Sequence, residues 1–472
     1  LIFTNLVKNY WKNDNEHVKV LHKIKEDENI IDIIDYDLRI RLANEIALTE
    51  AEYEKLIELT NAKIVYRIKN RLKYIIELNN GFSLSIDLTE VRMQNSINEI
   101  NKAKRYELEV EVINEKNNAK HAETVYDALI TEITLLQKML QKSNIVMSIS
   151  EKNAVMAAMN KLLYNNERAN KIDLPGMQPR SLGNQHISNL PTHYSATDKA
   201  DGERAFMFIH NNRIFLINNN LFIKEINSSE YDLKNYNDSI IDGEYIFTKK
   251  YNKYLFLGFD MLFDAGTNIQ NEVKLESRLE KMQNLMSNCF NSTVFIKKPT
   301  TMTKFDDIMG YYRETITSYF DEMNEKLKSK VDTVVMGKLF FIPSGLYDNE
   351  IFACSKMIWD GYTEANCPYL LDGIIYTGLN QIYTKDQQKI VYNIYKWKPP
   401  HMNTIDFYIK FKRDPDTNKI LYVYDNARGK NLTEKINEMN EEDVMNDFDM
   451  MGDFENYVSG NNKYVIAELY VG

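Results

Sequence analysis

Hydrophobic and polar residues alternate along four stretches between residues 31 and 113, which is the period of a β-strand with one buried face. These stretches are IDYDLRIRLANEIAL, KIVYRIKNRLKYIIEL, GFSLSIDLTEVRM and RYELEVEVI. From about residue 120 to residue 163 the apolar period lengthens to that of a helix. One face of this helical segment collects Val125, Leu129, Ile133, Leu136 and Leu140. The pattern therefore predicts several strands followed by helix.

The rest of the chain changes period several times, which predicts a multidomain α+β protein. In order we expect a Pro- and Gly-containing linker at 165–185, a β-rich region at about 190–262, helices near 272–287 and 303–329, strands at 369–377 and 391–398, and a last β region that opens with TIDFYIKF. No segment repeats at a fixed period.

Length and composition narrow the class of protein. At 472 residues the chain is long enough for two to four domains of about 100–200 residues each. No stretch reaches the roughly 18 apolar residues that a membrane span requires. Three cysteines without a CxxC pair indicate a reducing compartment and argue against a zinc cluster or a disulfide framework. The first residue is leucine and no signal peptide is visible, so we expect part of a longer protein.

The net charge of −10 argues against a protein that binds nucleic acid over a broad surface. A local basic site remains compatible with this charge. An enzyme that acts on one RNA end, or on a nucleotide, would need only such a local site.

The stretch TDKADGER offers the first candidate chemistry, with Lys199, Asp201, Gly202 and Arg204 in a K-x-D-G-x-R pattern. A lysine attacks phosphorus only as the neutral amine, so neighbouring cations or a metal must lower its pKa. Asp-Gly permits a sharp turn, and the arginine can bind a ribose or phosphate oxygen. The alternative interpretation is an ordinary surface hairpin whose charges are solvated.

Further polar residues follow in an order that completes a nucleotide site. They are Asp242 and Glu244 in IDGEYIF, Phe259 in LFLGFD, Asp372 in LLDGIIYT, and Lys396 and Lys398 in YKWKPP. A carboxylate can accept a hydrogen bond from ribose, an aromatic ring can stack on a purine, and two lysines on one strand face can bind phosphate. Each stretch taken alone is as typical of a turn, a core residue or a solvated strand.

The early strands carry charged stripes of opposite sign. Glu107, Glu109 and Glu111 share one strand face, and Arg67, Lys69, Arg71 and Lys73 share another. Arg39, Arg41, Asp87 and Arg92 lie on neighbouring stretches. Carboxylates that hold a divalent metal and cations that bind a polyphosphate would form a phosphohydrolase site. The other interpretation is a sheet with one solvated, charged face.

The ordered set between about 190 and 400 resembles the covalent nucleotidyltransferases, which include mRNA guanylyltransferases and the ATP- or NAD-dependent polynucleotide ligases. The resemblance implies a lysyl–nucleotide intermediate, Mg²⁺ or Mn²⁺, and an OB-fold that closes over the nucleotide. It implies that Lys199 is the nucleophile, that Asp201 belongs to the same motif, and that Asp372 is the acid of the fourth motif. It also implies that Arg204 and Glu244 contact the ribose, that Phe259 stacks on the base, and that Lys396 and Lys398 bind phosphate. Aspartate in the fourth motif favours guanylyl transfer over ligation.

Residues 30–115 resemble the tunnel-type, metal-dependent RNA triphosphatases. The resemblance implies that Glu107, Glu109 and Glu111 bind metal. It implies that Lys69, Arg71, Arg39, Arg41, Asp87 and Arg92 bind the 5′-triphosphate. The Glu-x-Glu strand that supplies the family's other metal ligands has no convincing counterpart in residues 1–30, so we expect it upstream of this chain.

Together these modules resemble the mRNA-capping enzymes of large DNA viruses, of the Mimivirus type. The expected domains are a partial tunnel-type β-barrel at 1–165, a linker at 166–186, a nucleotidyltransferase domain of antiparallel sheets with flanking helices at 187–402, and the start of an OB-fold at 403–472. The resemblance implies GTP and 5′-triphosphate RNA as substrates, no membrane, a methyltransferase domain or subunit outside this chain, and a location in a cytoplasmic viral factory or the virion. A polynucleotide ligase and a non-catalytic capping subunit are the alternatives.

Overall fold

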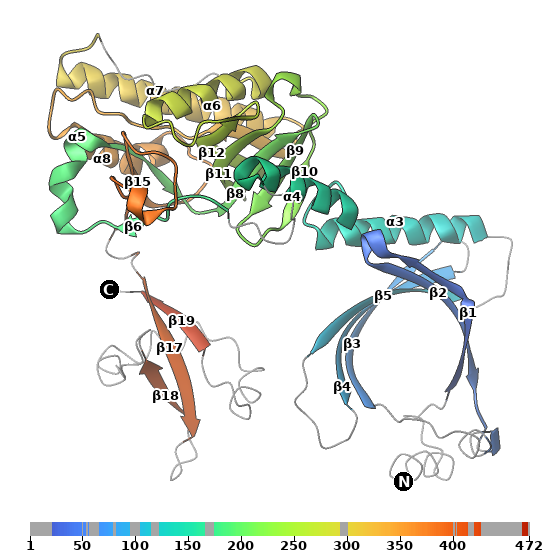
Figure 1. The fold of residues 1–472 in the computed structure, drawn as a ribbon. Helices are drawn as coiled ribbons and strands as arrows, with labels where there is room; N and C mark the ends of the chain where they lie inside the picture. Colours follow the sequence, from blue (N-terminus) through green and yellow to red (C-terminus); the bar gives the residue numbers. More distant parts are fainter. Residues whose placement is uncertain are drawn as a thin grey trace. The chain divides into compact units, whose positions relative to one another are not determined.

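The chain divides into two compact units, Leu1–Ala154 and Val155–Gly472 (Figure 1). The computed structural model describes residues 21–49, 51–52, 55, 66–78, 82–94, 104–114, 122–165, 174–292, 301–399, 402, 404–413, 420–425 and 465–470. None of the helices in these ranges is both long and apolar enough to cross a membrane.

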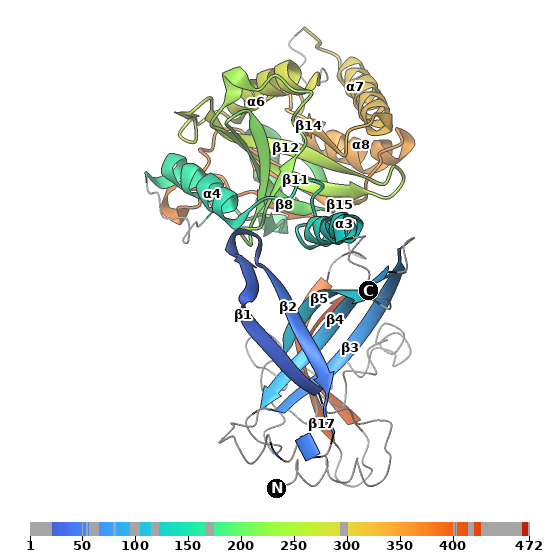
Figure 2. The ribbon, with the colours of Figure 1, turned by 90° about the vertical axis from the view of Figure 1, so that its right-hand side faces the viewer.

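The strands of unit 1 form two antiparallel sheets. Strands β1 (Leu21–Ile33) and β2 (Leu38–Ala47) form an antiparallel pair, and the short helix η1 (Ile34–Tyr36) connects them. Strands β3 (Tyr66–Glu77), β4 (Phe82–Gln94) and β5 (Arg105–Asn114) form the second sheet in chain order. Figure 2 shows the two sheets as separate layers. The expected β-structure is confirmed, but the strands described here do not close into a barrel.

Strand β1 begins at Leu21, ten residues before the first stretch for which alternation predicts a strand. Its pairing with β2 shifts register between Lys25 and Ile30. An irregularity of this kind inserts unpaired residues and breaks the period of two, so the sequence of this strand does not alternate. Residues 1–20 lie outside the described part of the chain.

The helical period after residue 120 is confirmed by α3 (Ala122–Leu140) and α4 (Ile149–Tyr164). Four of the five expected apolar residues on α3 are half-buried, and Leu140 is exposed. The Gln137 side-chain amide donates to the Tyr36 carbonyl at 2.9 Å, which ties α3 to the turn between β1 and β2.

Unit 2 contains a large sheet in the order β10-β9-β8-β11-β12-β13, and β14 pairs with β12 in parallel. The strands are β8 (Glu203–His210), β9 (Arg213–Asn218), β10 (Ile223–Ile226), β11 (Ser239–Thr248), β12 (Lys253–Asp264), β13 (Thr267–Asn268) and β14 (Thr333–Gly337). Helix α6 (Leu275–Phe290) buries its apolar face against one side of this sheet, with Leu279, Met282 and Met286 in the core. The opposite side contributes Leu255, Leu257 and Met336 to a second apolar core.

A second sheet of unit 2 has the order β6-β16-β15-β7. Its strands are β6 (Arg180–Ser181), β7 (Tyr194–Ala200), β15 (Leu371–Gly378) and β16 (Tyr395–Trp397), and short helical turns η3 (Asn184–Asn189) and α5 (Leu190–His193) precede β7. Helices α7 (Phe305–Lys328) and α8 (Glu350–Glu364) share a core with this sheet. The helices expected near 272–287 and 303–329 are confirmed, whereas β14 and α8 fall in a segment for which no element was expected.

The last described strands are β17 (Thr404–Arg413), β18 (Ile420–Asp425) and β19 (Val465–Tyr470). They form an antiparallel sheet in the order β18-β17-β19. The strand expected at TIDFYIKF is therefore confirmed. Three strands do not define an OB-fold, so that assignment stays a prediction.

Candidate active site

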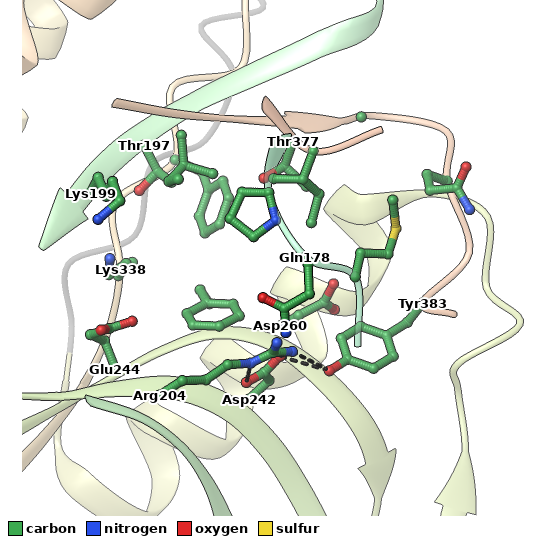
Figure 3. Close-up of a pocket in the computed structure, with 18 of the residues that line it drawn as sticks. Gln178, Thr197, Lys199, Arg204, Asp242, Glu244, Asp260, Lys338, Thr377 and Tyr383 are labelled. Carbon is green, nitrogen blue, oxygen red and sulfur yellow. Dashed lines mark hydrogen bonds and ion pairs between the residues drawn. The ribbon is translucent and has the colours of Figure 1, made fainter. Parts of the chain in front are cut away.

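A cavity of about 260 Å³ lies between the two larger sheets of unit 2. Both sheets contribute to its wall, as do α6, the residue after β14, and the segment before β6 (Figure 3). Its polar lining includes Gln178, Thr197, Asp198, Lys199, Arg204, Asn219, Asp242, Glu244, Asp260, Arg278, Lys338, Thr377, Gln381 and Tyr383. The region expected to bind a nucleotide thus contains an enclosed space with charged walls.

Lys199 occupies the penultimate position of β7, directly before the Asp201–Gly202 turn into β8. At Gly202 a Cβ would lie 2.8 Å from Glu244 Cγ and 2.9 Å from the Tyr245 carbonyl oxygen. Only glycine lets the turn approach β11 this closely. The Asp-Gly turn therefore brings the end of β7 close to Glu244, which was predicted to belong to the same site.

Asp372 faces Lys199 because the pairing of β15 with β7 is irregular at this point. Leu371 pairs with Ala200 and Gly373 pairs with Lys199, so Asp372 is the extra residue of a bulge. Gly373 has a φ of 143°, and a Cβ there would overlap the Trp397 carbonyl. The glycine of LLDGIIYT thus permits the bulge that aims the aspartate.

The Asp372 carboxylate joins two lysines. One oxygen accepts a hydrogen bond from the Lys199 amine, and the other lies 2.8 Å from the Lys398 amine. Burial acts to raise the pKa of this carboxyl, but the two lysine hydrogen bonds outweigh burial and hold its pKa below the ordinary value. The predicted nucleophile, fourth-motif acid and one predicted phosphate lysine therefore meet at one point.

Arg204 projects from β8 toward the floor of the cavity and is paired with Asp242 on β11. Its Nε and Nη2 donate to the two Asp242 oxygens at 3.0 and 2.6 Å. The Tyr383 hydroxyl lies 2.6 Å from Asp242 Oδ2 and accepts from Arg204 Nη2 at 3.2 Å. Burial raises the pKa of Asp242, while Arg204 counteracts part of this rise. Burial acts to lower the pKa of the Arg204 guanidinium, but the Asp242 carboxylate outweighs burial and holds this pKa above its ordinary value.

Glu244 and Lys338 lie beside Lys199 on the same side of the cavity (Figure 3). Burial raises the pKa of the Glu244 carboxyl, and the amines of Lys338 and Lys199 oppose this rise only in part. Lys338 is itself buried and lies 3.3 Å from the Asp198 carboxylate. This side of the cavity therefore concentrates amines and carboxylates that a phosphate group could contact.

Apolar side chains complete the cavity wall. Phe259 on β12, Phe340 after β14 and Ile375 on β15 all line it. Next to Phe259, Asp260 is bound by the buried Arg278 of α6 at 2.7 and 2.9 Å. Flat and branched apolar groups suit the faces of a planar base.

Most of the predicted site residues come together, and two do not. Lys199, Arg204, Glu244 and Phe259 line the cavity, and Asp372 and Lys398 join it through their ion pairs. Asp201 is exposed in the turn, and Lys396 is half-buried on β16 without lining the cavity. Lys396 and Lys398 follow the same strand, but only Lys398 forms a described ion pair with Asp372.

The sequence prediction missed Gln178, Lys338 and Tyr383. Lys338 directly follows β14, a buried strand that was not predicted. Its neighbours Leu339 and Phe340 are buried apolar residues, so nothing in the surrounding sequence indicates a polar site. Gln178 belongs to the expected linker, and Tyr383 to a loop after β15. Only PGMQP, a Pro-Gly turn with one polar side chain, offered a signal.

In unit 1 the charged stripes share one face of the β3–β5 sheet. Asp87 of β4 lies between Lys73 of β3 and Glu109 of β5 in the pairing register. Its buried carboxylate accepts from Arg71 Nη1 at 2.7 Å and lies 3.5 Å from the Lys73 amine. The expected opposition of a basic and an acidic stripe is therefore present as geometry.

The three glutamates each meet cations of β3. Glu107 lies 2.5 Å from Arg67 and 4.0 Å from Lys69, Glu109 lies 3.3 Å from Arg71, and Glu111 lies 4.0 Å from Lys73. Within the described residues, no group of three or more acidic, His or Cys side chains converges closely enough to hold a metal.

Three other predicted basic residues lie away from this face. Arg39 pairs with Asp32 across the β1–β2 hairpin at 2.5 and 2.9 Å, and Arg41 is exposed on β2. Arg92 is an odd number of residues from Asp87, so it projects from the other face of β4, where it pairs with Glu90. The described structure does not bring Arg92 together with Asp87.

The site of unit 2 combines a lysine at a strand end, beside a carboxylate, with an arginine, a glutamate and an aromatic ring that line one cavity. Two family models match parts of the chain. Residues 138–306 match the model "mRNA capping enzyme, catalytic domain", and residues 14–169 match the model "mRNA capping enzyme, beta chain".

Relatives agree with these matches. The chain is 31% identical over 427 residues to the probable mRNA-capping enzyme of Acanthamoeba polyphaga mimivirus, which covers 88% of this chain and 35% of that protein. It is 25% identical over 269 residues to the mRNA-capping enzyme subunit alpha of Yarrowia lipolytica, covering 52% of this chain and 57% of that protein. The chain thus spans about a third of the viral relative and little more than half of the yeast relative.

Among solved structures, a mycobacterial DNA ligase D complexed with ATP and MES resembles the chain with a TM-score of 0.31 and 14% identity. The likeness covers 53% of this chain and 68% of the ligase chain. A TM-score this low carries no conclusion about fold or function.

Proposed function

We propose that the chain caps mRNA in two steps. Unit 1 would remove the γ-phosphate from a 5′-triphosphate RNA end, and unit 2 would transfer GMP from GTP to the resulting diphosphate end. The observation that supports this most directly is Lys199 at the wall of the cavity, in contact with Asp372. The matches to both capping-enzyme models support the pairing of the two activities.

The first half of the guanylyl transfer centres on the Lys199 amine. It must lose a proton before it attacks, and the Asp372 carboxylate that already accepts its hydrogen bond is placed to take that proton. Attack on the α-phosphorus of GTP forms a P–N bond and breaks the P–O bond to pyrophosphate. The RNA diphosphate oxygen then attacks the same phosphorus, which breaks the P–N bond and returns the amine.

The neighbouring residues would bind the rest of the nucleotide. Arg204 and Glu244 would contact the ribose, Phe259 would stack on guanine, and Lys398 would neutralise phosphate charge beside Asp372. Asp201 and Lys396 would have supporting roles beside the nucleotide site, since neither lines the cavity.

Divalent metal fits the donor set at the Lys199 end. Asp372 and Glu244 offer carboxylate oxygens, the ligands that Mg²⁺ and Mn²⁺ prefer when they also bind a substrate phosphate. Bound there, such an ion would neutralise negative charge that develops on the α-phosphate. Asp372 would have to release at least one of its two lysines to serve as a ligand.

For unit 1 we propose that the β3–β5 face binds the RNA triphosphate. Lys69 and Arg71 would bind phosphate beside Asp87. Glu107, Glu109 and Glu111 would supply only part of the ligands of the metal, since these three do not by themselves converge on one point. The Thr89 hydroxyl of the same strand face is buried and has no hydrogen-bond partner among the described residues, which leaves it available to a ligand. Arg39, Arg41 and Arg92 would act at the margin of this site.

The proposed domains are a tunnel-type triphosphatase barrel at 1–165, a linker at 166–186, the guanylyltransferase at 187–402 and an OB-fold that begins at 403. A methyltransferase outside this chain would complete the cap. The proposed location is a viral factory in the host cytoplasm, or the virion.

The full chain, incubated with α-labelled GTP, Mg²⁺ or Mn²⁺ and 5′-triphosphate RNA, tests the function. We expect a labelled GpppN cap on the RNA, released by a nuclease that spares the triphosphate bridge. The same reaction with 5′-monophosphate RNA serves as the control and should yield no cap. Sealing of a nicked duplex with ATP, without any cap formation, would instead establish a polynucleotide ligase.

A further inference from the structure

We propose that Gln178 reads the polar edge of the guanine base, and that residues 174–179 form the wall of the base pocket. We call these residues the 174–179 strap. The inference rests on the proposed binding of GTP, and it assigns a base-binding role to a segment for which the sequence predicts only a linker.

The strap is anchored on both sides. The Tyr383 hydroxyl lies 3.2 Å from the Pro175 carbonyl oxygen, and Gly176, with a φ of 132°, packs so closely that a Cβ would overlap the Arg204 guanidinium. After the strap, the backbone N–H of Arg180 donates to the Ile394 carbonyl at 2.9 Å, where β6 joins β16. The strap is therefore held in place before any nucleotide binds.

The nucleophile fixes the direction in which a nucleotide lies. The α-phosphate must reach Lys199, and Lys338 and Glu244 lie beside it on the same side of the cavity (Figure 3). Gln178 and Tyr383 lie on the opposite side, with Thr377 above Gln178. The sugar and then the base must extend from the α-phosphate toward Gln178, because the base is the part of GMP farthest from its phosphate.

Most polar groups near Gln178 are already occupied. Asp260 is bound by Arg278, and both functional atoms of the Gln381 amide bond to backbone groups. Arg204, Asp242 and Tyr383 satisfy one another. The Gln178 amide, by contrast, makes no hydrogen bond to any other part of the chain that the structure describes, and its side chain is exposed in the cavity.

An amide is chemically suited to the edge of guanine. Its N–H can donate to O6 while its oxygen accepts from N1–H, so both groups form one flat pair of hydrogen bonds. The same amide, turned over, could also pair with adenine. Gln178 therefore supplies binding to a purine edge, and a carboxylate at this position would restrict that binding to guanine, whose N1–H and N2–H both donate.

The experiment measures the dissociation constants of GTP and ATP by calorimetry for the full chain and three variants. Gln178→Met keeps the side-chain length but removes both polar atoms, and we expect about tenfold weaker GTP binding from the lost hydrogen bonds. Gln178→Glu should keep GTP binding and weaken ATP binding, which raises the GTP/ATP preference. Gln185→Met, at an exposed position outside the cavity, is the matched control and should bind GTP as the unaltered chain does.

The outcomes separate this inference from the function on which it rests. GTP binding by Gln178→Met within twofold of the Gln185→Met control would overturn the role of Gln178 and leave the capping function standing. An unaltered chain that binds ATP but not GTP would overturn both the guanylyl transfer and the reading of guanine. Weaker GTP binding by Gln178→Met together with a higher GTP/ATP preference in Gln178→Glu would support the inference.

Discussion

Asp372 is the residue on which the geometry of the proposed reaction depends most. It contacts both Lys199 and Lys398, and its position follows from the bulge that Gly373 permits. Its carboxylate pairs with two half-buried amines. In the proposed reaction it would take a proton from one amine and position the other for phosphate.

The pH dependence of stability should report this carboxylate. Its pKa in the folded chain lies below the ordinary 3.8, so its ion pairs stabilise the fold fully above about pH 4 and lose this contribution as pH falls through the folded-state pKa. Asp372→Asn should lower the free energy of unfolding by on the order of 2 kcal/mol at pH 7. Urea unfolding at several pH values between 7 and 3 would measure the free energy of unfolding of the unaltered chain and of Asp372→Asn.

The difference between the two chains should shrink toward pH 3, because protonation removes the same charge that the substitution removes. A difference that stays constant down to pH 3 would show that Asp372 is not ionised against the lysines.

Single residues of the site could be predicted where spacing along one element determines their direction. Lys199 and Arg204 flank a turn that only glycine allows, and Asp372 precedes another such glycine. Lys338, Tyr383 and Gln178 could not be predicted in this way. They come from separate segments, and only the packing of two sheets brings them to one cavity.

At the scale of elements, the β3–β5 sheet is held by charge as well as by backbone pairing. Asp87 on the central strand is fully buried and contacts cations of β3, whereas the Asp32–Arg39 pair of the β1–β2 hairpin is exposed to solvent. Exposed ion pairs contribute little to stability, and a buried pair that loses one partner leaves an uncompensated charge.

Asp87→Ala should therefore lower the free energy of unfolding of the full chain by about 1–3 kcal/mol, since it leaves the buried Ser85 hydroxyl without its acceptor and removes the carboxylate that Arg71 and Lys73 share. Asp32→Ala is the matched control, and it should leave the free energy of unfolding close to that of the unaltered chain because its ion pair is exposed to solvent. Urea unfolding followed by circular dichroism compares the two variants. Equal losses for both substitutions would contradict the structural role of the buried aspartate.

Periodicity located most strands and helices, and its failures have physical causes. Alternation does not predict β1 because an irregular pairing interrupts the period of two in this strand. The Pro and Gly residues of the 174–179 strap predict a linker, because these residues occur both in linkers and where a chain crosses a cavity wall. Alternation along a strand shows which side chains share a face. It does not show whether neighbouring strands form two sheets, as the described strands of unit 1 do, or close into a barrel.

At the scale of the whole molecule, two units carry two groups of charged residues with different chemistry. Unit 1 presents acidic and basic stripes on one sheet, and unit 2 encloses a lysine in a cavity. The two matches to capping-enzyme models fall on these units in the same order. We propose that unit 2 holds a guanylate on Lys199 between the two half-reactions.

The most direct measurement is intact-mass spectrometry of the full chain after incubation with GTP and Mg²⁺ or Mn²⁺. The account predicts a mass increase of one GMP that survives alkali but not acid, as a P–N bond does. Lys199→Ala should remove it, and Lys356→Ala, at an exposed ion pair on α8, should leave it unchanged. An adduct that persists in Lys199→Ala, or that forms with ATP and not with GTP, would contradict the account.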